Sequence, residues 1–319
     1  MTEKFDVVTF GEALMLLLAD RPGPLETVDS FSRRIAGAEC NVAIGLSRLG
    51  FRVGWASRVG VESMGRYVLG AMRSEGVDCA HVLFDGDQKT GFMFKGKVND
   101  GSDPPVEYHR KGSAASLMDL PDIDETWLLS ARHLHATGVF AAVSASTFAV
   151  SRKAMDLMKA AGRTVSFDPN LRPNLWVTPQ AMREAVNELS TRADWVLPGL
   201  EEGRFLTGEQ TPEAVALFFR QRGAALVVVK LGSAGAYFDG ASGTGYVPGF
   251  PVPKVVDTVG AGDGFAVGVI SGLLDGLDLP EAVKRGAWIG ARAVQVRGDS
   301  EGFPTRAELT QHNVQQSRD

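Results

Sequence analysis

Residues 257–265 combine two aspartates with closely spaced small residues, in the order DTVGAGDGF. The apolar run 265–274 that follows predicts a buried helix, and the β-branched segment 254–256 before it predicts the end of a strand. Small residues over Gly260–Gly262 let backbone N–H groups converge at the helix start, where unpaired donors and the helix dipole bind anionic oxygens. Asp263 in such a site is suited to accept a proton beside a phosphate. An aspartate that only caps the helix is the alternative interpretation.

The run Asp257–Asp263 resembles the C-terminal signature of ribokinase-like carbohydrate kinases of the phosphofructokinase-B type. The resemblance extends from near Phe5 to near Thr305 and therefore covers nearly the whole chain. It implies that the aspartate at position 263 is the general base of a phosphoryl transfer from ATP. It also implies that three small residues form an anion hole for the transferring group: Gly260, Ala261 and Gly262.

A second small-residue segment, KLGSAG at 230–235, follows a predicted strand. From the residues alone it is a hairpin turn. In the family the corresponding segment lies against the nucleotide, and Asn170 falls at a nucleotide-side position. The resemblance therefore implies an ATP site that also contains Lys230, Gly232, Ser233, Gly235, Gly260 and Gly262. The chain has neither a GxxxxGK(S/T) nor a GxGxxG motif, so it predicts neither a P-loop NTPase nor a dinucleotide-binding fold.

The segment PGLEE at 198–202 resembles the family's Asn-x-x-Glu motif, which helps to organise magnesium and phosphates. Glu202 matches the glutamate, but Gly199 stands where asparagine is usual and removes a polar side chain. A solvated surface glutamate is the interpretation without the motif. ATP chemistry needs a divalent ion to neutralise phosphate oxygens, and Mg²⁺ keeps several waters and few protein ligands. We therefore expect Mg²⁺, with Glu202 acting on it indirectly.

The segment GAECN at 37–41 looks like the family's N-terminal motif, in which a Gly-Gly pair precedes a helix-starting asparagine. Here Ala36 replaces the first glycine. Gly37 would allow a sugar to approach the backbone closely, and Asn41 would bind a hydroxyl group. On spacing alone, Asn41 serves equally well as a simple helix-start residue.

Basic residues near the proposed cleft indicate an acidic substrate. Arginine binds a carboxylate in a planar, two-point fashion that lysine cannot reproduce. Tyr108 and Arg110 resemble the Tyr-x-Arg motif of 2-keto-3-deoxygluconate kinases, and Arg172 matches their Asp-x-Asn-x-Arg motif. The resemblance also implies that Asp299 binds a sugar hydroxyl. Phe92 is assigned to the substrate site as well, although it stands where some relatives have tyrosine.

The composition excludes several other classes of protein. The chain has 319 residues and a formal net charge of −5, which disfavours a nucleic-acid partner. The two cysteines, Cys40 and Cys79, form neither a CxxC motif nor a disulfide framework, which fits a reducing cytoplasm. The N-terminus does not have the pattern of a signal peptide, and no apolar run approaches the roughly 20 residues of a membrane span. His133 and His135 share a strand face without a visible third metal ligand.

Strands and helices alternate along most of the chain, which predicts a single α/β domain: a three-layer α/β/α fold with a mostly parallel central sheet. Segments 13–35 and 90–111 break this rhythm and predict a small β-sheet that projects from the main body, with a turn at 99–105. From the residues alone this is a simple edge hairpin; the family resemblance implies that it is a lid. Thr305 and Glu308 predict a capping box for a last helix. Ligands of open α/β sheets bind beyond the carboxyl ends of the strands, where the candidate residues cluster.

These patterns together predict an ATP-dependent kinase that converts 2-keto-3-deoxy-D-gluconate to its 6-phosphate. Asp263 would take the proton of the attacking hydroxyl, while Arg110 and Arg172 would hold the substrate carboxylate under the lid. A kinase for a neutral ketose such as fructose, or for a related sugar acid, is the first alternative. A non-catalytic regulator that binds sugar acids is the second. An exposed lid sheet also predicts a homo-oligomer.

Overall fold

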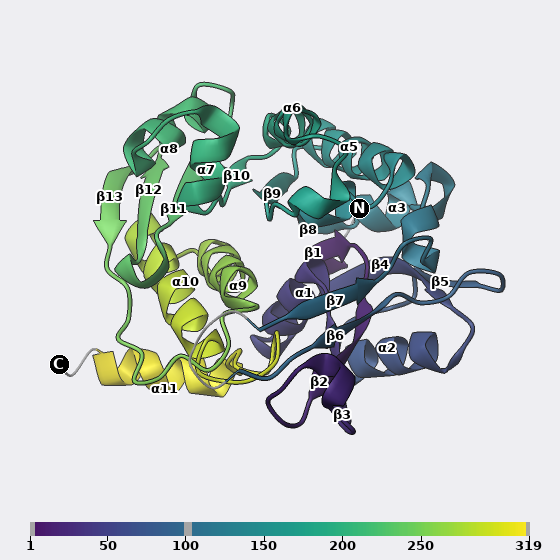
Figure 1. The fold of residues 1–319 in the computed structure, drawn as a ribbon. Coiled ribbons are helices and arrows are strands. Elements are labelled where there is room, and N and C mark those ends of the chain that lie inside the picture. Colours follow the sequence, from purple (N-terminus) through teal and green to yellow (C-terminus); the bar gives the residue numbers. More distant parts are fainter. Residues whose placement is uncertain (1–3, 99–103, 317–319) are drawn as a thin grey trace.

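The computed structural model describes residues 4–98 and 104–316 and places them around one large sheet and one small sheet (Figure 1). The large sheet has nine strands in the order β13-β12-β11-β10-β9-β8-β1-β4-β5. All of its pairings are parallel except β11–β12 and β12–β13, which add an antiparallel edge. Its strands are β1 (Phe5–Phe10), β4 (Val53–Gly60), β5 (Val82–Asp85), β8 (Ala131–Thr137), β9 (Thr164–Asp168), β10 (Trp195–Val196), β11 (Leu226–Lys230), β12 (Ala236–Gly240) and β13 (Gly243–Val247).

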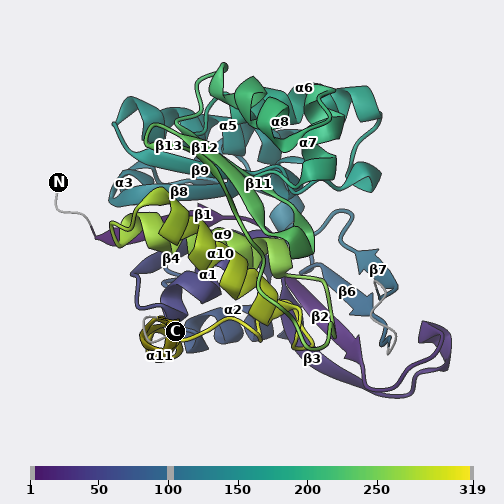
Figure 2. The ribbon, with the colours of Figure 1, turned by 90° about the vertical axis from the view of Figure 1, so that its left-hand side faces the viewer.

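Helices cover both faces of this sheet, as Figure 2 shows. One face packs against α1 (Ala38–Arg48), α2 (Ser63–Ser74), α9 (Ala261–Leu274) and α10 (Leu279–Ala293), with α11 (Arg306–Gln316) at its margin. The other face packs against α3 (Glu125–Leu129), α4 (Gly138–Ala141), α5 (Ala145–Ala160), α6 (Pro179–Ser190), α7 (Leu200–Thr207) and α8 (Pro212–Arg220). Each interface is a separate cluster of buried apolar side chains. Because the central strands are buried on both faces, their sequences are almost continuously apolar. The predicted three-layer α/β/α fold is confirmed.

The small sheet has the strand order β3-β2-β6-β7 and projects from one side of the main body (Figure 2). Its strands are β2 (Leu14–Ala19), β3 (Phe31–Ala36), β6 (Phe92–Lys95) and β7 (Val106–His109). These strands come from the two segments predicted for the lid, and β6 and β7 pair antiparallel as expected of a hairpin. Residues 99–103 of the predicted turn lie outside the described part of the chain.

The faces of the small sheet differ in composition because side chains alternate along each strand. Leu14, Leu16 and Met93 are buried on the face toward the cavity, where they form an apolar cluster of their own. Phe92 and Phe94 lie on the opposite face in contact with each other and with His109, whose ring stacks on Phe92 at 4.6 Å between centroids. At one end of this outer face Phe92 packs against the main core, and the rest of the face is aromatic and only partly covered.

One expectation about the segment before α9 is wrong. Residues 254–256 form no strand; they run as an extended loop, from which the Val256 N–H donates to the Val294 carbonyl at 2.7 Å. The buried helix predicted over 265–274 is present and begins at Ala261. β-branched residues indicate extended backbone, but a strand also needs a neighbouring strand, and this segment instead hydrogen-bonds to Val294 at the end of α10. The predicted capping box of the last helix is present, since Glu308 accepts the Thr305 N–H at 2.8 Å.

Candidate active site

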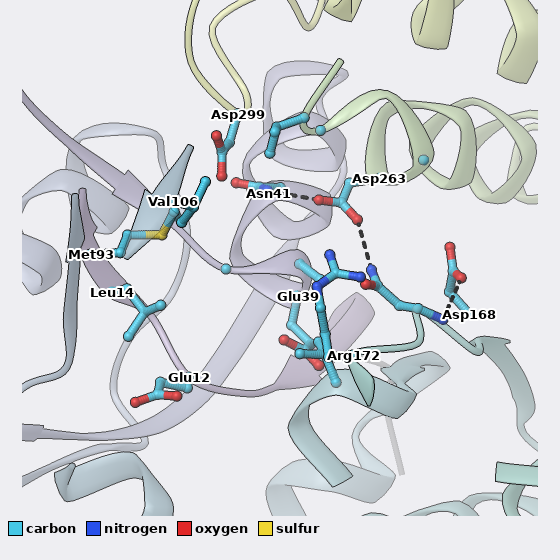
Figure 3. A pocket seen from close by; sticks show the side chains of 18 of the residues that line it. Glu12, Leu14, Glu39, Asn41, Met93, Val106, Asp168, Arg172, Asp263 and Asp299 are labelled. Atoms are coloured by element: carbon cyan, nitrogen blue, oxygen red, sulfur yellow. Dashed lines mark hydrogen bonds between the residues drawn. The ribbon is translucent and has the colours of Figure 1, made fainter. Parts of the chain in front are cut away.

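A cavity of about 450 Å³ lies between the carboxyl ends of the central strands, the first turns of α1 and α9, and the inner face of the small sheet. Figure 3 shows Leu14, Met93 and Val106 of the small sheet on one side, with Asp263 and Asp168 on the other. The cavity collects twelve of the residues predicted for the site: Gly37, Asn41, Tyr108, Arg110, Asn170, Arg172, Glu202, Lys230, Gly260, Gly262, Asp263 and Asp299.

Gly260 forms the turn into α9 and adopts a left-handed conformation with φ of 83°. A Cβ at this position would lie 1.9 Å from the carbonyl oxygen of Asp299, so glycine is required both by its dihedral angle and by the close approach. In the helical turn that follows, the N–H groups of Gly262 and Asp263 have no intrahelical acceptor. The backbone here therefore presents the donors and the positive helix end that an anionic oxygen needs.

Asp263 is buried at the cavity wall, with 8% of its surface exposed. Its Oδ2 accepts a hydrogen bond of 2.7 Å from the Asn41 amide, and its Oδ1 accepts one of 3.4 Å from the Asn170 amide (Figure 3). Burial raises the pKa of Asp263 to about 7, and the negative charge of Asp168 adds to the rise. A carboxylate that titrates near neutrality and is held by two amides has the properties of a general base.

The two amide side chains beside Asp263 can each accept a hydrogen bond from a ligand. The Oδ1 atoms of Asn41 and Asn170 are buried and accept no hydrogen bond from the described residues. Asn170 also has a positive φ of 39°, and no other described residue except glycine does. Backbone strain of this kind is retained where the surrounding structure fixes it, often at binding sites. Both amide oxygens could accept hydrogen bonds from a hydroxylated substrate.

Lys230 lies at the carboxyl end of β11, beside the start of α9. Its Nζ donates to Asp168 at 2.6 Å, and a Cβ added to Gly262 would lie 3.5 Å from this Nζ. Burial acts to lower the pKa of Lys230, but the carboxylates of Asp168 and Glu202 outweigh it and raise the pKa. The lysine is therefore a fixed positive charge next to the exposed backbone donors of α9, where a phosphate would be stabilised.

Glu202 is held by the backbone rather than pointing freely into the cavity. Its Oε1 accepts the Leu171 N–H at 2.7 Å, and its Oε2 accepts the Gly199 N–H at 2.8 Å as part of the cap of α7. In the described part of the chain no three histidine, cysteine or acidic side chains form a metal-binding group. These residues fit a magnesium ion only if phosphate oxygens and water supply most of its ligands.

The sugar side of the cavity contains an ion pair that sequence reasoning missed. The guanidinium of Arg110 pairs with Glu12, a carboxylate with only 3% of its surface exposed, which also accepts a hydrogen bond from Ser113. Arg110 was predicted to grip a substrate carboxylate, but in this structure a carboxylate of the chain itself already occupies it. The position of Glu12, two residues after β1, is the signal that could have found it, because it lies at the same sheet edge as the other candidates.

A second missed carboxyl group is Glu39, in the first turn of α1. It is fully buried, accepts a hydrogen bond from the Thr137 hydroxyl, and lines the cavity. Burial raises the pKa of Glu39 to about 7. Arg172, by contrast, is exposed; one of its Nη atoms donates to the Leu171 carbonyl, and Figure 3 shows the side chain beneath Asp263.

Five predicted residues lie outside the lining of this cavity. Phe92 is on the outer face of the small sheet, stacked on His109, because the neighbouring residue Met93 points inward. Ala261 lies within the first turn of α9, next to lining residues. The others belong to the short turn between β11 and β12: Gly232, Ser233 and Gly235. This turn joins two antiparallel strands, so the hairpin interpretation describes its geometry; its contact with a nucleotide remains a prediction.

Comparison with known proteins decides the family. The model of the pfkB family of carbohydrate kinases matches residues 4–306. The chain belongs to this family. It is 48% identical to a 2-dehydro-3-deoxygluconokinase of Bacillus subtilis, over 96% of this chain and 94% of the relative. This match confirms the resemblance to a carbohydrate kinase.

Solved structures of the family agree with the fold. The crystal structure of a PfkB protein from Polaromonas has a TM-score of 0.90, is 72% identical, and covers 96% of this chain and 99% of that one. A fructokinase from Vibrio cholerae, solved with fructose, ADP and calcium ion, has a TM-score of 0.83 at 30% identity, with 96% and 98% covered. This pfkB carbohydrate kinase has, in its described part, no helix long and apolar enough to cross a membrane.

Proposed function

We propose that this kinase transfers the terminal phosphoryl group of ATP to the C6 hydroxyl of 2-keto-3-deoxy-D-gluconate. The observation that carries the proposal is Asp263, a buried carboxylate with a pKa of about 7 beside the glycine-initiated start of α9. The relative from Bacillus subtilis, which is named a 2-dehydro-3-deoxygluconokinase, supports this substrate.

In this mechanism Asp263 takes the proton from the C6 hydroxyl as the oxygen forms a bond to the γ-phosphorus. The bond from the γ-phosphorus to the bridging oxygen breaks, and its electrons leave with ADP. The N–H groups over Gly260–Gly262 and the ammonium of Lys230 hold the charge of the transferring group. Phosphoryl transfer requires mainly such placement and charge stabilisation, since there is little covalent chemistry for the protein to perform.

Magnesium, when bound to ATP, neutralises β- and γ-phosphate oxygens. Glu202 and Asp168 are the acidic residues on the phosphate side of the cavity and would hold it through water molecules. Glu202 contributes indirectly in another way, because its two backbone hydrogen bonds fix the segment around Leu171 against the start of α7. It therefore also orients the neighbouring Asn170 and Arg172.

Arg172 is the residue we assign to the substrate carboxylate. It lies at the cavity wall near Asp263, and its positive charge acts to lower the pKa of this aspartate, against the larger rise caused by burial. Asn41 and Asn170 have free amide oxygens for sugar hydroxyls. The proposal retains contacts from Gly37, Tyr108 and Asp299, which also line the cavity. Arg110 would contact the carboxylate only if Glu12 releases it.

One observation favours a second candidate. Because Glu12 already neutralises Arg110, the cavity offers a sugar acid one unpaired arginine rather than two. A neutral ketose such as fructose would suit that arrangement, and the fructokinase from Vibrio cholerae shares the fold. The test is ADP release in the presence of 2-keto-3-deoxygluconate, its galacto epimer, fructose and ribose. The highest kcat/KM with fructose or ribose would overturn the sugar-acid assignment.

The proposal also includes pairing of two copies through the small sheet. Its outer face presents Phe31, Phe92, Phe94 and His109 as one connected aromatic cluster that is only partly covered. An uncovered apolar sheet face is usually buried against a partner. Light scattering during size-exclusion chromatography should give twice the mass of 34.1 kDa for wild type, and Phe94→Lys should give the mass of one chain.

The proposal also places the protein in the cytoplasm, where ATP is available.

A further inference from the structure

A lysine of the small sheet is completely buried and takes no part in the mechanism given above. Lys95, at the end of β6, has no exposed surface. Its Nζ lies 2.6 Å from Oδ2 of Asp257 and 3.0 Å from Oδ1 of Asp299. Removing an ammonium group from water costs several kcal/mol unless its partners compensate, so such a group is retained where it fixes an arrangement. Both partners belong to the loops that surround the start of α9.

Asp257 is the residue at which the loop into α9 begins. Its Oδ1 accepts the Val259 N–H at 3.1 Å, and its Oδ2 accepts the Gly298 N–H at 3.3 Å in addition to the bond from Lys95. The carboxylate therefore ties the turn just before Gly260 to the loop that follows α10. The ammonium group of Lys95 neutralises the charge of this carboxylate.

Asp299 forms the wall behind the same turn. Its carbonyl oxygen is so close to Gly260 that a Cβ there would lie at 1.9 Å. Lys95 thus holds two residues that fix Gly260: Asp257, which precedes it in the chain, and Asp299, which packs against it. A movement of either residue would therefore shift the backbone N–H donors at the start of α9.

The small sheet contacts this region at two further points. Arg297 donates to the carbonyl of Ala19 on β2 at 2.7 Å. Arg34 on β3 pairs with Glu301 at 3.1 Å. Both pairs are more exposed than Lys95, so the buried ammonium is the contact best able to keep its geometry. Together the three contacts join the small sheet to the loop at 297–301.

We propose that Lys95 is a positioning residue for phosphoryl transfer, because its ammonium group fixes the anion-binding turn at Gly260 from both sides and ties that turn to the small sheet. The inference rests on the kinase chemistry proposed above but not on the identity of the acceptor. Lys95 does not touch the reacting atoms; it acts through Asp257 and Asp299. Its loss should therefore lower the rate of the chemical step and leave the binding of ATP nearly intact, while sugar binding weakens less than the rate falls, because Asp299 also contacts the sugar in the proposed function.

The test compares Lys95→Met with Lys97→Met in the full chain. Lys97 lies two residues further along the same segment and donates to a backbone carbonyl, that of Asp20 at 3.1 Å. We expect kcat of Lys95→Met to fall about a hundredfold, the range seen when one oriented donor is lost from an anion hole. The stoichiometry and Kd for a non-hydrolysable ATP analogue by calorimetry should stay within about threefold of wild type, and the KM of the sugar should rise by less than about tenfold, because Asp299 loses only its Lys95 partner. Lys97→Met should match wild type throughout.

A charge-balanced variant keeps the test decisive if Lys95→Met does not fold. Lys95→Met/Asp257→Asn removes one positive and one negative charge, and the asparagine oxygen can still accept the Val259 N–H. This variant should bind the analogue with full stoichiometry and show the same loss of kcat. A folded variant with kcat within about threefold of wild type would overturn the proposal, as would failure of both variants to fold, which would make Lys95 a stability residue only.

The outcome for Lys95 is separable from that for the substrate. The assay uses the acceptor that wild type phosphorylates with the highest kcat/KM in the sugar panel. If that acceptor is fructose, the assignment to 2-keto-3-deoxygluconate fails while the comparison of Lys95→Met with Lys97→Met proceeds unchanged. If 2-keto-3-deoxygluconate is preferred and Lys95→Met turns over normally, the inference fails while the substrate assignment stands.

Discussion

The two walls of the active-site cavity are built in different ways. On the wall formed by α9 and the central strands, each functional group is fixed by neighbours close to the reacting position: Asp263 by two amides, Lys230 by Asp168. On the wall toward the small sheet, a charge predicted to bind the substrate is instead neutralised by another charge of the chain, as Arg110 is by Glu12. In the proposed function, the first wall carries the reaction and the second selects the sugar.

The largest effect should come from the wall that carries the reaction. Asp263→Asn keeps the shape of the side chain but removes the proton acceptor, so kcat should fall roughly 10³-fold while the KM of ATP changes little. The measurement is ADP release at pH 8 with saturating substrates. The variant should also melt no lower than wild type at this pH, because it removes a buried charge that is costly to keep ionised. Turnover close to wild type would assign the proton transfer to another group.

The sequence predicted which residues gather at the reaction wall because their signals are local. Small residues followed by an aspartate and an apolar run specify a helix start with unpaired backbone donors, and the family resemblance added the role of Asp263 as general base, which stays a prediction. The same holds for Lys230, the last residue of β11, and for Asn170, just beyond the end of β9, because a parallel sheet brings its ligand-binding residues together at this edge. The alternation of strands and helices was enough for the three layers.

The sugar wall was predicted less well because the pairing of its charged side chains with each other leaves no local signal in the sequence. Nothing local indicates that Arg110 pairs with a residue 98 positions earlier, or that Lys95 reaches the loop at 257–263. The orientation of Phe92 was a question of strand register, since a shift of one residue would exchange it with Met93. The strand predicted at 254–256 is absent for a similar reason, because whether an extended segment pairs with a neighbouring strand depends on the tertiary fold.

The pH dependence of activity should follow the reaction wall. The pKa of Asp263 is raised to about 7, so kcat/KM should rise tenfold per pH unit below 7 and be about a hundredfold lower at pH 5 than on the plateau. Stability should change in the opposite sense. A carboxyl group with a raised folded pKa contributes stability below its ordinary value of 3.8, and this contribution is lost as pH rises through about 7.

Glu39 provides the control for this profile, since burial also raises its pKa to about 7. Glu39→Gln should keep the rise of kcat/KM with pH, because Asp263 is unchanged. If Glu39→Gln removes the rise, the titration belongs to the sugar wall and the division between the two walls does not hold.

A smaller effect is expected at Arg172, between the two walls. Loss of a charge-assisted hydrogen bond costs about 1.5–3 kcal/mol, so Arg172→Ala should raise the KM of the sugar acid at least about tenfold with little change in kcat. Arg172→Lys keeps the charge but not the two-point contact, so its KM for the sugar acid should lie between those of wild type and Arg172→Ala. Steady-state kinetics with fructose as second acceptor shows whether the effect is specific. An equal rise in KM for fructose would mean that Arg172 shapes the cavity rather than binding a carboxylate.

The smallest effect should come from Glu12, and it tests the sugar wall most directly. Glu12→Gln keeps an oxygen for the hydrogen bond from Ser113 but removes the charge that neutralises Arg110. Because Arg110 is then an unpaired cation lining the cavity, the KM of a sugar acid should fall about threefold, whereas the KM of fructose should not change. Glu12→Asp, which keeps the charge, should leave the preference between the two sugars as in wild type. If Glu12→Gln instead weakens both acceptors equally, the ion pair serves to hold Arg110 in position, and the selectivity of this wall resides in Arg172 alone.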